Sequence, residues 1–446
     1  MDQLPRKLGL LDATLIVIGI VIGVGIFLLP NLIARSLPSI SAILAVWIVA
    51  GVLSYFGALA YAELGAMMPV TGGQYVYLRE AFGPGWAFLC GWVMVLAVVP
   101  GGMAFLAAGF SIYLGQFVHL SPALQTAVSL TLVVVLSTAN YIGVKEGAWI
   151  QRIFTTLKIA GILLLIGAAM FTSRAGVTAP PAPAKTLSYS AIGLAMTAIL
   201  MAYNGWSYVS FVSGEVKNPE RNLPLSLALG MIAVILLYVT VNIAYFKVLT
   251  VGEIAATERV GAAVAARMLG PAGANGLSVV VLLSIIGALN GNILTGARIP
   301  FAEARDGLFF SRFGRVHPRF ETPGFAIVAL GVWTCILLLT GSYQELFAYS
   351  ILSAWLFYTL SVVAVAVLRR KAPDAPRPYR MWGYPYTIWA FVVVSMWFMV
   401  DALINQPKTS LAAFGIAAAG IPLYFIWRKK PGEREPVPVA AEHPEI

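Results

Sequence analysis

The sequence predicts an all-α integral membrane protein with twelve transmembrane helices. Two features of its composition lead to this: hydrophobic residues make up 59% of the 446 residues, and charged residues only 11%. A soluble domain carries about 25% charged residues, so a soluble enzyme or a string of soluble domains is excluded. The third observation is twelve apolar stretches near the ~20 residues that a helix needs to cross a bilayer. Together they leave no room for a separate soluble domain.

The twelve stretches follow one another along the chain and are joined by short loops. The first ten are residues 10–36, 41–67, 85–116, 122–141, 150–172, 189–215, 223–248, 276–305, 324–340 and 345–369. A final pair covers 386–403 and 408–427. We therefore expect a single transmembrane domain over residues 1–427. The tail, 428–446, is rich in proline and charge, a composition typical of disorder.

Lysine and arginine are unevenly divided between alternate loops. With the N-terminus in the cytoplasm, 21 of the 29 Lys and Arg residues fall in cytoplasmic segments and 6 in external ones, while Lys158 and Lys247 fall within spans. Because cytoplasmic loops carry the excess of positive charge, we expect both termini in the cytoplasm. The same bias accounts for the net charge of +10, so nucleic-acid binding is not expected.

Cysteine and histidine are too scarce for a metal framework. The chain has three His and two Cys, and both Cys90 and Cys335 lie in apolar stretches. Neither a disulfide scaffold nor a redox pair is suggested, and we expect no metal and no cofactor. A membrane enzyme would need clustered His, Asp or Glu within the membrane, where we find the isolated Lys158.

Two of the predicted spans contain residues that interrupt a helix. The first reads Gly23-Val24-Gly25 at its centre, and the sixth contains Asn204-Gly205, a turn-favouring pair. Backbone groups freed inside a bilayer must line a cavity or be buried in protein. Broken spans at corresponding positions are typical of inverted-repeat transporters, which predicts repeats over about 10–172 and 189–369. The alternative is that the glycines only permit close helix packing.

The broken ends also suggest a kind of ligand. A half-helix N-terminus exposes N–H groups and a partial positive charge, which suit a carboxylate. A half-helix C-terminus exposes carbonyl groups, which suit an ammonium. Neither break contains Asp, Glu, Lys or Arg. The two breaks together could therefore hold the backbone of an α-amino acid without any charged side chain.

Four stretches make the chain resemble the amino acid–polyamine–organocation (APC) superfamily over essentially its whole length. They are GVGIF at 23–27, GALAYAELG at 57–65, AYNGW at 202–206 with GEVKNPERNLP at 214–224, and NG at 290–291 with AEARDG at 302–307 and VHP at 316–318. Within the superfamily the chain is most similar to the L-type amino acid transporters, and among them to bacterial serine/threonine exchangers.

The resemblance implies a five-plus-five inverted repeat with helices 1 and 6 broken, followed by an appended pair over about 386–427. It also implies a function: sodium-independent transport of small neutral L-amino acids, of the serine, threonine and alanine type, by alternating access. The location implied is the plasma membrane, that is, the cell inner membrane. The mechanism implied is exchange of one amino acid for another.

The resemblance further implies which residues bind substrate. It places the carboxylate at backbone N–H groups near Val24, Gly25 and Ile26, and the α-amino group at carbonyls near Val21, Met201, Ala202 and Asn204. Relatives often carry Gly or Asp where this chain has Asn204, whose side chain could contact a small polar substrate or cap the break. Trp355 matches an aromatic residue that closes over the substrate side chain. No acidic residue lies in this pocket, so a basic substrate is not expected.

Lys158 is an ionisable residue inside an apolar span, which suggests a function by default. The alternative is snorkelling to the cytoplasmic surface, because the residue lies about 12 Å into its span at 1.5 Å per residue. In L-type relatives a lysine at this position stands in for a sodium ion and ties span 1 to spans 5 and 8. The resemblance places Tyr238 near this lysine and the substrate.

Other interpretations stay open at this point. Proton-coupled uptake through Lys158 or Glu63 is the alternative among transporters, and a transporter-like amino acid sensor is the alternative of another class. Glu63 and Glu215 are more simply explained as partners of loop arginines. Animal L-type transporters join a heavy subunit through a Cys between spans 3 and 4. Residues 115–121 contain no Cys, so no disulfide-linked heavy subunit is expected there.

Overall fold

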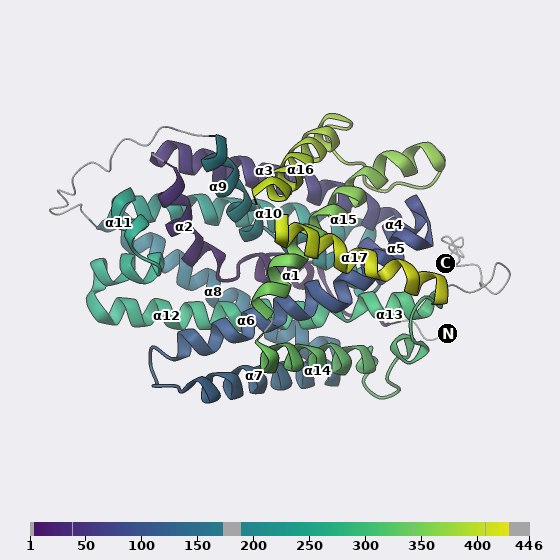
Figure 1. Cartoon of the computed structure of the whole chain (residues 1–446), viewed down its shortest axis with the longest axis horizontal. Helices are drawn as coiled ribbons and strands as arrows, with labels where there is room; N and C mark the ends of the chain where they lie inside the picture. Colours follow the sequence, from purple (N-terminus) through teal and green to yellow (C-terminus); the bar gives the residue numbers. More distant parts are fainter. Residues whose placement is uncertain (1–3, 38, 173–188, 342, 406, 428–446) are drawn as a thin grey trace.

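The protein is built from helices that run side by side (Figure 1). A computed structural model describes residues 4–37, 39–172, 189–341, 343–405 and 407–427, and the predicted tail, 428–446, lies outside this part. Within the described ranges there is no β-strand, and Leu8 and Val216 form an isolated parallel bridge. Nine helices there are long and apolar enough to cross a membrane, or ten if one bent pair counts as a single span. The predicted all-α membrane architecture is confirmed.

The helices of the first half follow the predicted spans closely. The bent pair is α1 (Leu10–Val21) and α2 (Gly25–Ser36), and the next helix is α3 (Ile40–Met67). The remaining elements are the short α4 (Gln74–Phe82), a long span made of α5 (Pro84–Val93), the π-helical η1 (Met94–Val98) and α6 (Val99–Leu114), then α7 (Pro122–Ile142) and α8 (Val144–Phe171). Helix α8 begins at Val144, six residues before the predicted start at residue 150. The prediction missed the first turn because that turn carries the charged residue Glu146 and is not part of the apolar stretch.

The second half begins with another interrupted segment, α9 (Tyr189–Ala202) followed by the 3-10 helix η2 (Trp206–Glu215). The later elements are α10 (Pro219–Val248), α11 (Val251–Ala256), α12 (Val260–Gly296), α13 (Arg298–Arg305), η3 (Ser311–Gly314), α14 (Gly324–Thr340), α15 (Tyr343–Lys371), α16 (Tyr386–Asn405) and α17 (Pro407–Trp427). Two predicted spans, 189–215 and 324–340, fall short of a full crossing as single helices: one is interrupted, and α14 has 17 residues.

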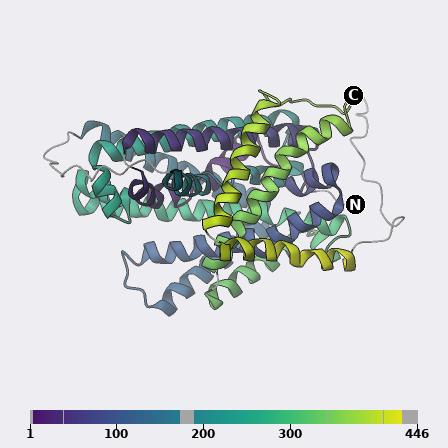
Figure 2. The same ribbon diagram turned by 45° about the horizontal axis from the view of Figure 1, so that its top comes forward.

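Helix α1 lies near the centre of the molecule (Figure 1), where it contacts α8, α10, α12 and η2. The strongest helix pairs around it are α3 with α10 and α8 with α12. The last three helices, α15 to α17, contact one another, and Figure 2 shows them grouped together in yellow-green and yellow. Helix α1 thus packs against the long helices α8, α10 and α12, while α2 packs against α9, α11 and α12.

Both ends of the described chain reach the same loop, which joins α13 to α14. Near the start of the chain, Lys7 forms an ion pair with Glu321 of this loop. At the other end, the ring of Trp427 lies 5.6 Å from that of Phe309 and 5.0 Å from that of Phe310. The two ends therefore lie on one side of the molecule.

Candidate functional site

The first helix break separates α1 from α2, which are bent by 40°. Gly23 N–H donates to the Val21 carbonyl at 2.9 Å, and Val24 precedes the first residue of α2. In the described part of the chain, no hydrogen bond uses the N–H groups of Val24, Gly25 or Ile26. These are the donors that a helix N-terminus leaves unpaired, and they carry its partial positive charge. The break therefore offers a set of N–H groups suited to an anion.

The second break separates α9 from η2. Gly205 has φ +112°, a conformation that favours glycine, and Asn204 N–H donates to the Met201 carbonyl at 3.1 Å. A Cβ atom at Gly205 would lie 2.6 Å from Cγ2 of Ile20. The Asn-Gly pair thus turns the chain at a point where only a glycine can sit against α1.

We expect Gly205→Ala to destabilise the protein by about 1–2 kcal/mol or more, since the left-handed backbone conformation alone costs an L-residue that much. The clash with Ile20 adds to this cost. Thermal unfolding of the purified protein measures the effect. Gly167→Ala on α8 is the matched control, because a Cβ there meets nothing within 4 Å. Equal unfolding temperatures for the two variants would contradict the conclusion that only glycine fits at position 205.

The two breaks face each other across a short distance. A Cβ atom on Gly25, at the start of α2, would lie 3.2 Å from Cβ of Ala202, at the end of α9. Unpaired N–H groups at one helix start thus lie beside the carbonyl groups at another helix end. Four of the predicted site residues, Val24, Gly25, Met201 and Asn204, are partly exposed here, while Val21, Ile26 and Ala202 are buried.

Tyr238, on α10, bridges the two breaks. Its hydroxyl lies 2.9 Å from the Val21 carbonyl oxygen and 3.0 Å from that of Ala202, so its single proton is shared between the two acceptors. The ring is fully buried and packs edge-on against Trp47 of α3. Because a carbonyl oxygen has two lone pairs, the Ala202 carbonyl can accept a further hydrogen bond, whereas the Val21 carbonyl already accepts from Gly23 N–H and from Tyr238.

Lys158, on α8, is fully buried and reaches α1. Its ammonium donates to the carbonyls of Gly19 at 2.8 Å, Ile22 at 2.6 Å and Ser284 at 3.0 Å. The Ser284 hydroxyl, on α12, also donates to Ile22 at 2.9 Å. Snorkelling is therefore excluded: the charge points inward and links the end of α1 to α8 and α12. Among the described residues, no group of His, Cys, Asp and Glu could hold a metal ion.

Helix α15 reaches the second break through a residue that the sequence did not single out. The Tyr358 hydroxyl donates to Oδ1 of Asn204 at 2.9 Å. Trp355, predicted to cover the substrate, lies on the same helix, and its ring stacks on that of Phe391 of α16 at a centroid distance of 5.8 Å. Tyr358 lies three residues after Trp355 and so shares its helix face. This spacing is the signal that could have revealed it.

Buried ion pairs gather toward the end of the molecule where the chain ends lie. Glu215 forms two hydrogen bonds of 2.7 Å with Arg298, and both side chains are fully buried. Arg298 belongs to α13, so the prediction of a loop arginine as its partner was wrong in this case. Glu63 pairs with Arg369 at the end of α15, at 2.7 Å. These contacts hold η2, α13, α3 and α15 together.

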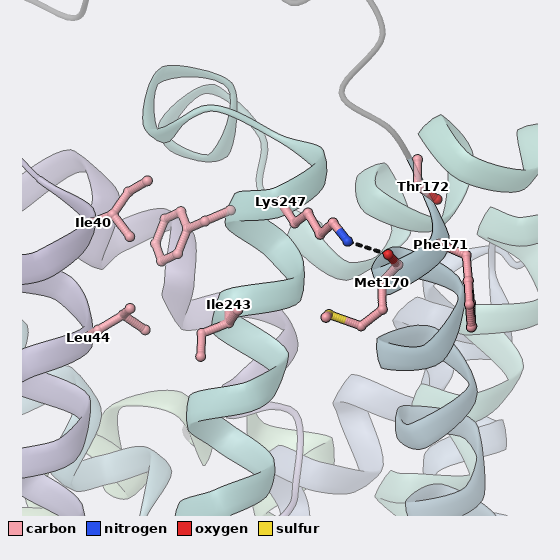
Figure 3. A pocket seen from close by; sticks show the side chains of 8 residues that line it. Ile40, Leu44, Met170, Phe171, Thr172, Ile243 and Lys247 are labelled. Carbon is pink, nitrogen blue, oxygen red and sulfur yellow. Dashed lines mark hydrogen bonds between the residues drawn. The ribbon is translucent and has the colours of Figure 1, made fainter.

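A cavity of about 660 Å³ lies elsewhere, between α3, α8 and α10 (Figure 3). In Figure 3, Lys247 points from α10 toward α8, where its ammonium donates to the Met170 carbonyl. The lining residues are Ile40, Leu44, Met170, Phe171, Thr172, Ile243, Phe246 and Lys247. Since none of them belongs to either break, this cavity is separate from the candidate site.

Comparison with known proteins decides the family. The sequence profile described as amino acid permease matches residues 8–426. The chain belongs to the amino acid permease family. The resemblance to the APC superfamily is thereby confirmed, and a profile that extends from before α1 to the last turn of α17 covers both helix breaks.

Several curated relatives align with almost the whole chain. The human "Cystine/glutamate transporter" is 34% identical over 443 residues, covering 96% of this chain and 87% of that protein. The "Serine/threonine exchanger SteT" of Bacillus subtilis (strain 168) is 31% identical over 432 residues, covering 96% and 98%. The rat "Large neutral amino acids transporter small subunit 2" is 32% identical over 447 residues, covering 96% and 82%. These relatives are transporters and exchangers rather than enzymes, so this permease is a multi-pass membrane transporter and not an enzyme.

Proposed function

We propose that this permease exchanges small neutral L-amino acids, of the serine, threonine and alanine type, across the plasma membrane without sodium. The observation that carries the proposal is the contact between the start of α2 and the end of α9 at Gly25 and Ala202. It brings unpaired N–H groups and carbonyl groups together at one site. An α-amino acid carries the complementary carboxylate and ammonium on adjacent atoms.

Recognition of the amino acid backbone falls to main-chain groups. The carboxylate accepts hydrogen bonds from the N–H groups of Val24, Gly25 and Ile26, where the positive end of α2 favours an anion. The ammonium donates to carbonyls at the ends of α1 and α9, the candidates being those of Val21, Met201, Ala202 and Asn204. No residue of either break is charged. The site thus suits a zwitterion. A neutral side chain adds no further charge that would need a charged partner in the site.

Lys158 accounts for transport without sodium. Its ammonium binds the Gly19, Ile22 and Ser284 carbonyls, which join the end of α1 to α12. These are oxygen ligands of the kind a hard cation takes, and the lysine supplies the positive charge instead. A second cation at the same oxygens would be repelled. Sodium is therefore neither needed nor accommodated.

Exchange follows if the loaded carrier changes conformation more readily than the empty one. Substrate that binds the occluded state more tightly shifts the population toward closure, and α1, α2, α9 and η2 then rock against the surrounding helices. Proton coupling through Glu63 is disfavoured, because its carboxylate binds Arg369. We propose no disulfide-linked heavy subunit, since residues 115–121 contain no Cys.

Twelve spans in two inverted repeats are part of the proposal. Counting α1 with α2, α9 with η2, and α14 as crossings, in addition to the nine continuous helices, supplies all twelve. Repeat one then ends with α8, repeat two runs from α9 to α15, and α16 and α17 are appended. Both termini are cytoplasmic in this scheme. The shared loop at Glu321 and Phe309 and the uneven charge distribution support this orientation.

Uptake of radiolabelled serine into proteoliposomes tests the proposed function. One set is preloaded with unlabelled neutral amino acids and the other is empty, both in sodium-free buffer at symmetric pH. We expect uptake into the loaded vesicles only, with no stimulation when sodium replaces potassium. Equal uptake into both sets would indicate a uniporter. Binding of serine without uptake into either set would favour a sensor.

A further inference from the structure

The orientation of the Asn204 amide determines whether the site donates a hydrogen bond to the substrate side chain or accepts one from it. Asn204 is partly exposed at the second break, while its neighbours Tyr203 and Gly205 are buried. An amide side chain has an accepting end, the oxygen, and a donating end, the NH2 group. Which end faces the substrate decides whether the site prefers side chains that accept or side chains that donate.

Tyr358 fixes which end is turned away. Its hydroxyl donates to Oδ1 of Asn204 at 2.9 Å. Turning the amide over would bring Nδ2 to the hydroxyl, whose proton would then have to point away from Asn204, so the hydrogen bond between hydroxyl and amide oxygen would be lost. The observed orientation keeps this hydrogen bond.

The ring of Tyr358 is itself held in place. It is buried between Trp206 of η2, whose ring centroid lies 5.6 Å away, and Trp355 of α15, at 6.0 Å. A ring packed between two tryptophans has little freedom to move its hydroxyl. Trp355 thus helps to hold the ring of Tyr358 in position by packing against it.

We propose that Tyr358 sets the side-chain specificity of the permease by holding the Asn204 amide with its NH2 group toward the substrate. This rests on the proposed function, since it concerns the same site. Tyr358 is a positioning residue, and Asn204 is the residue that contacts substrate. A donor at this place favours side chains with an acceptor oxygen close to Cα, the hydroxy amino acids serine and threonine. It disfavours cationic side chains, which can only donate.

The expected preference is modest because one neutral hydrogen bond at a partly exposed site carries it. Such a bond corresponds to a factor of about three to ten in specificity. We expect kcat/KM for serine to exceed that for alanine by roughly this factor in the wild type. The difference lies in the side-chain hydroxyl, since the two substrates present the same backbone groups.

A double-mutant cycle on exchange kinetics tests the proposal. Tyr358→Phe frees the amide to turn, so we expect the serine-to-alanine ratio to fall to about one. Asn204→Ala is expected to lower the ratio equally, and the double variant no further. A second measurement is competition by 2,3-diaminopropionate, whose cationic side chain has the length of serine's. Its competition should rise in Tyr358→Phe, where the amide oxygen can face it, but not in Asn204→Ala.

Tyr203→Phe is the matched control. This buried tyrosine loses a hydrogen bond from its hydroxyl to the Trp47 carbonyl, at 3.3 Å, and is expected to keep the wild-type ratio. An unchanged ratio in Asn204→Ala would overturn the proposal, even if Tyr358→Phe failed to fold. The proposal would also be overturned if Tyr358→Phe changed the serine-to-alanine ratio by the same factor in the Asn204→Ala variant as in the wild type. Failure of the wild type to exchange either substrate would instead contradict the proposed function, and this inference with it.

Discussion

Lys158→Met is expected to lower the rate of sodium-free serine exchange by about 100-fold or more. Methionine has nearly the length of lysine but no charge, so the carbonyls of Gly19, Ile22 and Ser284 lose their hydrogen bonds from the ammonium, and Ile22 keeps the bond from the Ser284 hydroxyl. Hydrogen bonds to a charged group are worth about 1.5–3 kcal/mol each, and 1.4 kcal/mol is a factor of ten. Initial rates in preloaded proteoliposomes at matched protein content measure the loss.

Lys247→Met is the control for this substitution. Lys247 also donates to a backbone carbonyl, that of Met170, but lies on the separate cavity between α3, α8 and α10. We expect its exchange rate to stay within about twofold of the wild type. Exchange by Lys158→Met at the wild-type rate would show that the lysine charge is dispensable. Rescue of Lys158→Ala by sodium would support its role as a substitute for a cation.

Arg298→Met is expected to cause a large loss of stability. The guanidinium forms two hydrogen bonds of 2.7 Å with Glu215, and both side chains are fully buried. Removing one partner leaves an uncompensated buried charge, which costs about 3–5 kcal/mol. A decrease of roughly 5–10 °C in the thermal unfolding midpoint of the detergent-solubilised protein should follow.

The control for the buried pair is Glu321→Gln. Glu321 pairs with Lys7 at the surface, where its side chain is 51% exposed, and such pairs contribute about 0–1 kcal/mol. Its unfolding midpoint should change by at most a degree or two. If Arg298→Met shifts the midpoint no more than Glu321→Gln does, the buried pair does not hold η2 and α13 together as described.

The features that local sequence determines were predicted well. Helix α14 has the predicted limits of 324–340, because an apolar stretch bounded by Pro323 and Gly341 defines a helix without help from neighbours. The interruption at Asn204-Gly205 was likewise visible, since the pair favours a turn wherever it occurs. Lys158 stood out because a charge in an apolar stretch needs partners.

The partners themselves could not be predicted from sequence. Lys158 reaches carbonyls of Gly19 and Ile22, 139 and 136 residues earlier in the chain, and backbone carbonyls have no sequence signature. Arg298 resembles a loop arginine until η2 places Glu215 beside it, 83 residues away in sequence. The contact of Tyr358 with Asn204 spans 154 residues. Such contacts depend on how the helices assemble, which no local pattern encodes.

Competition against labelled serine exchange tests most directly whether each break holds one charged group of the substrate. The competitors are L-serine itself, ethanolamine, which lacks the carboxylate, and 3-hydroxypropionate, which lacks the ammonium. If Val24, Gly25 and Ile26 bind the carboxylate while the ends of α1 and α9 bind the ammonium, each analogue leaves one set of groups unpaired. Both should then compete at least about 100-fold more weakly than L-serine. An analogue with a single charged group that competes as well as L-serine would contradict this division of roles.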